Sequence, residues 1–272
     1  MRSAPARVLR ALPTLLRIGV AETVAYRAEF LVWMLTSTMP LIMLSLWTSV
    51  ASEGPFQSYT SADFVAYFLG VLIVRNLTGN WVAFQLSEEV RLGTLSMRLL
   101  RPIHPFIAYA TSHAAALPFR SLIALPIAIV LLISSGASSL TTEPLQLALL
   151  VPSIALAWLI TFGIMFAIGC ASFWITQAFG IFNFYFGLWS LLSGYLMPMS
   201  IMHAKYPLIA DVARSLPFYY MLGAPVELMT KHLSGEQVAT LLVWQLVWAT
   251  LSVLAALGMW RKGVNHFEAV GG

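Results

Sequence analysis

The residues that could carry out chemistry are few and scattered in this chain of 272 residues. His203 and His232 have no neighbouring histidine, aspartate or glutamate at zinc-ligand spacing, and His104 and His113 are nine positions apart. No serine stands in a nucleophile-elbow pattern. Cys170 is the one cysteine, which excludes an intrachain disulfide and a cysteine-based metal cluster. The sequence therefore predicts no catalytic site and no metal site.

The pentapeptide Leu233–Gln237, LSGEQ, resembles the signature sequence of an ATP-binding cassette, but the rest of the chain does not support an ATP site. No G-x-x-x-x-G-K-[ST] loop is present to hold phosphates, and no hydrophilic domain is present to hold a nucleotide. If this protein uses ATP, another polypeptide must bind it.

One sustained charged passage, Gln85–Pro102 (QLSEEVRLGTLSMRLLRP), lies between long apolar runs. Its polar residues recur at spacings of three and four, and apolar residues fill the other side, which predicts one or two short amphipathic helices. Glu88 and Glu89 come first and the arginines follow, an order that suits the helix dipole. Gly93 interrupts the pattern, and Pro102 is expected to end or bend it.

Two interpretations of this passage are open. It is a solvated cytoplasmic loop lying on anionic lipid, or it is a docking element that receives force from a soluble partner. The pattern alone favours the first. In the second, acidic and basic residues form a polar face that pairs with the partner, and Leu92, Leu95 and Leu99 tie the element to the flanking helices. The candidate coupling residues are Glu88, Glu89, Arg91, Gly93, Thr94, Leu95 and Arg98.

The composition predicts an all-α polytopic membrane protein. Hydrophobic residues make up 59% of the chain and charged residues 10%, and the mean hydropathy is +0.82. A soluble domain carries about a quarter charged residues. The net charge of +4 comes largely from five arginines before residue 30 and three between Arg91 and Arg101. That distribution is typical of membrane topology and does not predict a nucleic-acid partner.

A helix that crosses a bilayer needs roughly 20 mostly apolar residues. Six stretches meet that requirement, and together they predict one transmembrane domain over residues 1–272. The stretches are about Phe30–Val50, Phe64–Phe84, Ala114–Ser134, Leu145–Ala171, Ala178–Pro198 and Val238–Trp260.

Lysine and arginine predict the orientation. Loops 51–63 and 135–143 contain neither residue. The N-terminus and the Gln85–Pro102 loop contain arginines, and Arg261 is followed by Lys262. Since cytoplasmic loops carry the excess of these residues, both termini and segment 85–105 are predicted to be cytoplasmic. Residues 1–29 fit either a helix lying in the cytoplasmic membrane interface or a basic flank that orients the first span.

Because successive loops alternate between the two sides of the membrane, segment 199–237 is predicted to lie outside. It is too apolar for a free loop, and its apolar stretches are too short for a span. Pro207, Pro217 and Pro225 divide it into pieces too short to cross. Its tyrosines suit the membrane interface, so we expect short helices dipping into or lying on the outer leaflet, in contact with lipid.

Arg75 is the outlier within the predicted spans. It lies about midway along its span, beside Asn76 and near Asn80. An unpaired arginine at the bilayer centre costs at least ~2.5–3.5 kcal/mol, so Arg75 must face protein or water. Arg75, Asn76 and Asn80 are therefore candidates for a substrate pathway or a contact between subunits. The alternative is an arginine satisfied by backbone carbonyls in a packed bundle.

The arrangement as a whole resembles the permease subunits of type-2 ABC exporters. The run E-E-V-R-L-G-T-L-x-x-x-L-L-R-P, Glu88–Pro102 here, is similar to that family's coupling region. The resemblance extends to the order of spans and amphipathic segments along essentially the whole chain, and it points to the compact bacterial permeases of the inner membrane. It implies an assembly of two permeases, identical or paralogous, with two cassette ATPases that bind ATP and magnesium. The substrate path would lie between the permeases, and the exported substrate stays unknown.

Two other functions remain open from the sequence. A secondary transporter would need carboxylates within the membrane for ion coupling, and the six predicted spans hold no convincing aspartate or glutamate. A membrane scaffold or assembly factor without transport activity fits the same composition. Stimulation of a co-purified cassette ATPase would separate the permease from both.

Overall fold

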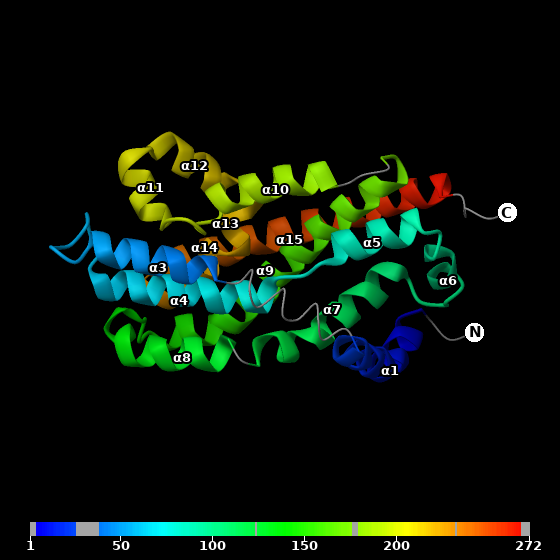
Figure 1. Ribbon diagram of the computed structural model, residues 1–272, viewed down its shortest axis with the longest axis horizontal. Coiled ribbons are helices and arrows are strands. Elements are labelled where there is room, and N and C mark those ends of the chain that lie inside the picture. Colours follow the sequence, from blue (N-terminus) through cyan, green and yellow to red (C-terminus); the bar gives the residue numbers. More distant parts are fainter. Residues whose placement is uncertain (1–3, 26–37, 123, 176–178, 232, 268–272) are drawn as a thin grey trace.

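The computed structural model describes residues 4–25, 38–122, 124–175, 179–231 and 233–267 (Figure 1). Those residues form an all-helical fold, in which the one strand-like pairing is a bridge between Phe56 and Tyr59. The helices are α1 (Ala4–Ala25), α3 (Met39–Val50), α4 (Ser61–Thr78), α5 (Val82–Arg91), α6 (Leu95–Leu99), α7 (Pro105–Ser121), α8 (Ala124–Ser135), α9 (Pro144–Cys170), α10 (Phe179–Leu192), α11 (Met199–Lys205), α12 (Pro207–Ser215), α13 (Pro217–Met221), α14 (Gly223–Thr230) and α15 (Gly235–Gly263). Short 3₁₀ turns are η1 (Ala137–Ser139), η2 (Ala171–Phe173) and η3 (Val264–His266).

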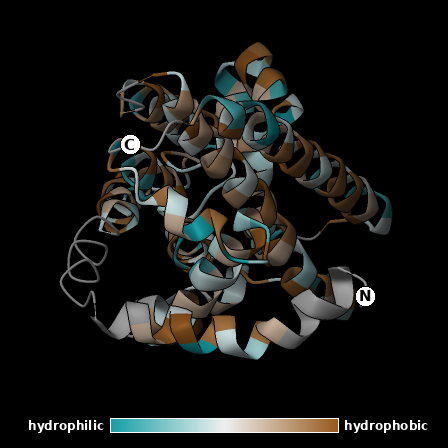
Figure 2. Cartoon of the chain, turned by 90° about the vertical axis from the view of Figure 1, so that its right-hand side faces the viewer, coloured by the Kyte–Doolittle hydropathy of each residue, from teal (hydrophilic) through white to brown (hydrophobic). Residues whose placement is uncertain are grey.

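The molecule has two distinct ends along its long axis. Helices α1 and α6 lie at one end, where the last described residues of the chain also lie, and α11 and α12 lie at the other (Figure 1). We call these the α6 end and the α12 end. Figure 2 looks onto the α6 end and shows α1 running across the other helices. That orientation fits the predicted interfacial helix within residues 1–29.

Within the part of the chain that the structure describes, three stretches are long and apolar enough to cross a membrane: 61–91, 144–173 and 235–266. The other predicted spans correspond to shorter apolar helices, which are Met39–Val50, Leu125–Ser135 and Phe179–Leu192. The first predicted span begins outside the described residues, as does the fifth. The structure thus supports a multi-pass membrane protein, and the count of six crossings stays a prediction.

The helix of the fifth predicted span ends at Leu192, before the predicted end at Pro198, and two other predicted spans are each divided into two helices. The second, Phe64–Phe84, breaks where Gly79 adopts an extended backbone, and α5 starts after Asn80, whose Oδ1 accepts a hydrogen bond from the Val82 N–H at 3.4 Å. The third, Ala114–Ser134, divides into α7 and α8. Pro126, in the first turn of α8, has no N–H to continue a helix from α7, which explains the division.

Helices α9 and α15 form the long central pair, and small and polar residues allow their close approach. A Cβ on Gly163 would lie 2.9 Å from Ser252, so only glycine fits there. Gln245 in α15 accepts a hydrogen bond from Ser153 Oγ at 2.8 Å and donates to the Tyr220 carbonyl at 3.0 Å. These buried contacts join α9, α15 and α13 within an apolar environment.

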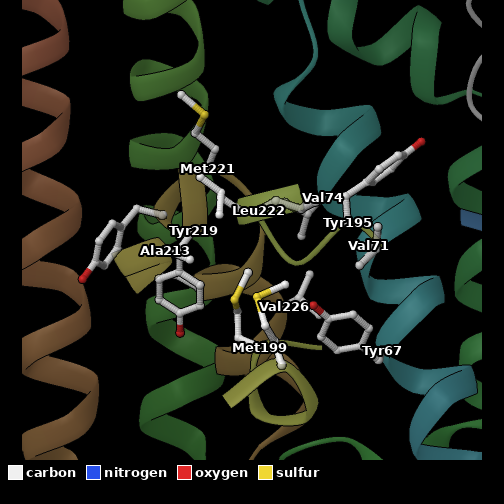
Figure 3. Packing of buried hydrophobic residues seen from close by; sticks show 14 of the residues in the cluster. Tyr67, Val71, Val74, Tyr195, Met199, Ala213, Tyr219, Met221, Leu222 and Val226 are labelled. Carbon is white, nitrogen blue, oxygen red and sulfur yellow. The ribbon is translucent and has the colours of Figure 1, made fainter. Parts of the chain in front are cut away.

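The broken segment 199–237 forms short helices as predicted, with Pro207 and Pro217 at the first positions of α12 and α13. Pro225 does not divide it, because this proline lies in the first turn of α14, where no donor is needed. The position of these helices relative to the outer leaflet stays a prediction, and residues 223–229 of α14 are all buried within the described protein. Figure 3 shows why: Val226 and Leu222 pack against Tyr67 and Val74 of α4.

Candidate functional site

The connection between α5 and α6 at the α6 end is a tight reversal. Gly93 has a φ of 73°, a conformation that glycine adopts without steric cost. The reversal returns Leu95 to the core, where it is fully buried with Leu86 and Phe106. Gly93 and Leu95 therefore fix the path of α6 relative to α5.

A carboxylate inside this reversal joins three helices. Glu89 of α5 accepts two hydrogen bonds from Arg98 of α6, from Nε at 2.8 Å and from Nη2 at 2.6 Å. The Tyr109 hydroxyl of α7 donates to Glu89 Oε2 at 2.6 Å, and the Arg98 guanidinium lies over the Tyr109 ring at 4.1 Å. The side chains of Arg98 and Glu89 are only 16% and 18% exposed. We call Glu89, Arg98 and Tyr109 the latch.

In the latch, the Arg98 guanidinium donates two hydrogen bonds to the Glu89 carboxylate, and the neutral Tyr109 hydroxyl donates a third. Such bidentate arginine–carboxylate contacts fix geometry as well as contributing energy. Gln85 adds a weaker donor to Glu89 Oε1 at 3.3 Å, and its own Oε1 lies 3.1 Å from His113 Nε2 of α7. These side-chain hydrogen bonds therefore connect helices α5, α6 and α7 to one another.

The structure divides the candidate coupling residues in a way the sequence did not predict. Glu89 and Arg98 pair with each other, so they do not belong to an outward polar face. Glu88, Arg91 and Thr94 are exposed. Within the predicted apolar face, only Leu95 is buried, whereas Leu92 and Leu99 are exposed. A turn at Gly93 reorients α6, so that each of the two predicted faces is divided between the core and the surface.

An apolar surface therefore projects from the α6 end. Leu100 is 80% exposed, Met97 67% and Leu92 57%. Exposed charged groups lie beside them in the chain, at Glu88, Arg91 and Arg101. We call Leu92, Met97 and Leu100 the apolar tip.

A comparison with protein families gives a match to the ABC-2 family transporter protein over residues 31–271. This chain belongs to the ABC-2 transporter family. It is accordingly the membrane component, or permease, of an ABC transporter, and the family implies a partner ATPase. A comparison with curated proteins found no match for the chain.

The predicted pathway residues of this permease do not gather at one site. Asn76 donates to the Leu72 carbonyl at 2.8 Å, and Asn80 accepts the Val82 N–H, so both satisfy backbone groups of their own segment. Arg75 lies over the rings of Trp189 and Tyr195, at 5.2 and 4.9 Å from their centroids. It contacts protein, as expected for an arginine midway along a span, with aromatic rings in place of carbonyls.

A buried carboxylate at the α12 end escaped the sequence analysis. Glu227 of α14 is 5% exposed, accepts a hydrogen bond from the Tyr219 hydroxyl at 2.7 Å and pairs with Lys231 at 2.9 Å. The four-residue spacing of Glu227 and Lys231 was visible in the sequence. That spacing does not reveal that the pair is buried, because the burial depends on the packing of α14 against α4 and α9.

Proposed function

We propose that this permease is the membrane subunit of an ATP-driven exporter of the bacterial inner membrane. It works as a dimer with a second permease, identical or paralogous, and the substrate path lies between the two. Separate cassette ATPases bind ATP and magnesium, and they dock at the α6 end, which is cytoplasmic. The chain itself supplies no ATP site.

The apolar tip is the observation that carries the docking proposal. Large apolar side chains that project from the surface of a protein mark sites of contact with another molecule. Protein interfaces commonly combine an apolar centre with a charged rim, and Leu92, Met97 and Leu100 with Arg91 and Arg101 fit that description. A docked ATPase or a lipid surface would each cover these three side chains, and the pull-down below separates the two.

The latch supports the transmission part of the proposal. A docked element passes on movement only if it is stiff, since a flexible loop would absorb the displacement. Glu89 and Arg98 fix α6 against α5, and Tyr109 connects both to α7. Helix α7 in turn packs closely on α1, where a Cβ on Gly19 would lie 2.9 Å from Ala115. A push on α6 would thus reach α7 and α1 together.

Helix α10 supports the dimer part of the proposal. Gly180 and Gly187 are seven residues apart, and a Cβ at either would meet no atom within 4 Å. These glycines are therefore not needed for packing inside the described chain, whereas small residues on an open face allow a second helix to approach. If the partner is an identical copy, cysteines at Gly187 should crosslink two permeases, and cysteines at Leu246 of α15 should not. The reverse pattern would rule out α10 as the seam.

Docking is tested by the double substitution Met97→Glu with Leu100→Glu, in which carboxylates replace the two most exposed side chains of the apolar tip. We expect the cassette ATPase to be lost from a pull-down and export from inverted vesicles to stop, while the permease still inserts. Leu208→Glu, at an equally exposed leucine of the α12 end, is the matched control. Unchanged pull-down and transport in the double variant would contradict the proposal. Docking without any transport in the wild type would instead favour a scaffold.

A further inference from the structure

A groove of about 820 Å³ lies at the α12 end, away from the coupling site. It is bounded by the last turn of α12, by α13, by the end of α14 and by the first turns of α15. Both charged and apolar side chains face it, including Arg214, Tyr220, Lys231, Glu236, Thr240 and Leu241. The groove is therefore amphipathic.

Arg214 is the uncompensated cation of this groove. Its Nε is buried and has no hydrogen-bond partner, and its guanidinium lies 6.0 Å from the centre of the Tyr219 ring. Among the residues that the structure describes, Arg214 forms no ion pair, whereas Lys231 is neutralised by Glu227 at 2.9 Å. Arg214 lines the groove without an ion-pair partner, and a guanidinium in that position favours an anionic ligand, above all a carboxylate or a phosphate.

An exposed apolar stripe leads away from the groove along α15. Gln237 and Thr240 line the groove, and Trp244, Val247 and Leu251 continue the same face at helical spacing. Those three side chains are 47%, 39% and 47% exposed. A ligand with an anionic end at Arg214 and an apolar tail would therefore find a surface for each part.

We propose that this groove binds the phosphate head group of an acidic amphiphile, with Arg214 holding the phosphate and the α15 stripe holding the tail. The guanidinium fork matches two phosphate oxygens, which an ammonium group cannot do. Glu236 on the rim disfavours ligands with more than a small negative charge. The inference stands on the groove alone and does not depend on ATPase coupling at the other end.

The test uses the purified full-length protein in a neutral detergent, with thermal stability as the signal. Three probes are titrated: dioleoylphosphatidylglycerol, dioleoylphosphatidylcholine and inorganic phosphate. We expect phosphatidylglycerol to stabilise at the lowest concentration. Arg214→Gln should raise its half-maximal concentration roughly tenfold, the effect of losing one charged hydrogen bond. Lys205→Gln removes the same charge from the neighbouring helix α11 and should change little.

Three results would overturn the proposal. The first is equal stabilisation of the wild type and Arg214→Gln by phosphatidylglycerol, and the second is an equal loss in Lys205→Gln; in either case the effect would not come from this groove. The third is a stabilisation by inorganic phosphate that matches the lipid and depends on Arg214, because the tail would then play no part.

A second variant keeps the test valid if Arg214→Gln does not fold. Glu236→Gln removes the negative charge from the rim and should lower the half-maximal phosphatidylglycerol concentration about threefold. Glu53→Gln, at an exposed acidic residue outside the groove, is its control. An equal response to phosphatidylglycerol in Glu236→Gln and Glu53→Gln would reject Arg214 and its groove as the binding site.

Discussion

The two ends of this permease use their charged and apolar residues in opposite ways. At the α6 end, the strongest charged pair, Glu89 with Arg98, turns inward, and leucine and methionine side chains face outward. At the α12 end, the apolar helix α14 turns inward with its Glu227–Lys231 pair, and Arg214 is left unpaired beside a groove. A charged run in the sequence is thus not by itself a charged surface.

The difference matters because an inward-facing ion pair contributes to folding, whereas an outward-facing charged group contributes to binding. An inward pair fixes the relative position of helices and is costly to break from one side. An outward group contributes little to folding and is available to a partner. Substitution of each charged residue distinguishes these two descriptions, and the largest effect is expected within the latch.

Glu89→Gln should have the largest effect on folding. The substitution removes the charge that Arg98 pairs with and weakens the acceptor of Tyr109, so we expect a loss of about 2–3 kcal/mol in the free energy of unfolding. Glu88→Gln, at the adjacent exposed position, should change it by less than about 0.5 kcal/mol. Denaturation in mixed micelles measures both. Equal losses in the two variants would mean that the latch does not hold the α6 end together.

Glu227→Gln should cost less, about 1–2 kcal/mol, because the amide oxygen still accepts the Tyr219 hydroxyl and Lys231 is partly hydrated. The added change Lys231→Met should recover part of that loss, since it removes the cation left without a partner. The double-mutant cycle in the same micelles reports the coupling. Strictly additive losses would show that the α12 end has no internal pair comparable to the latch.

The smallest expected effect concerns pH at the start of α7. His104 Nδ1 accepts the Phe106 N–H at 3.2 Å, which requires the neutral ring. Burial lowers the pKa of His104 below 6.5, and Arg261 lowers it further. A lowered pKa in the folded state means that this contribution is present above pH 6.5 and is lost as the pH falls through the lower folded value. His104→Asn keeps a capping oxygen without titrating.

Melting temperatures between pH 7.5 and 5 measure this contribution. The wild type should lose slightly more stability on acidification than His104→Asn does. Identical profiles would remove His104 from the set of contacts that stabilise the α6 end.

Much of this architecture was predictable from the sequence, since it follows from local composition. The apolar lengths around α9 and α15 predicted two long helices within one or a few residues at each end. The interruption of the helix at Gly93 and the divisions at Pro207 and Pro217 were also predicted, although the reversal of the chain at Gly93 was not. These features depend on residues within one or two turns of each other.

The features that were missed depend on contacts between distant segments. The latch requires Tyr109 of α7, which lies 20 residues from Glu89 in the chain. The burial of α14 requires the faces of α4 and α9, which no local pattern reveals. Helical spacing identified Glu89 and Arg98 as members of one set, but only their position relative to α7 shows that they face inward.

Site-specific photo-crosslinking of both ends in intact cells tests the central claim most directly. A photoreactive residue placed at Leu100, on the apolar tip, should give an adduct with the mass of one cassette ATPase, and the same residue at Leu208 of α12 should give none. Position 88 should give weaker adducts with the ATPase, and position 95 should give none because it is buried. An ATPase adduct at 208 with none at 100 would contradict the assignment of the α6 end as the docking surface.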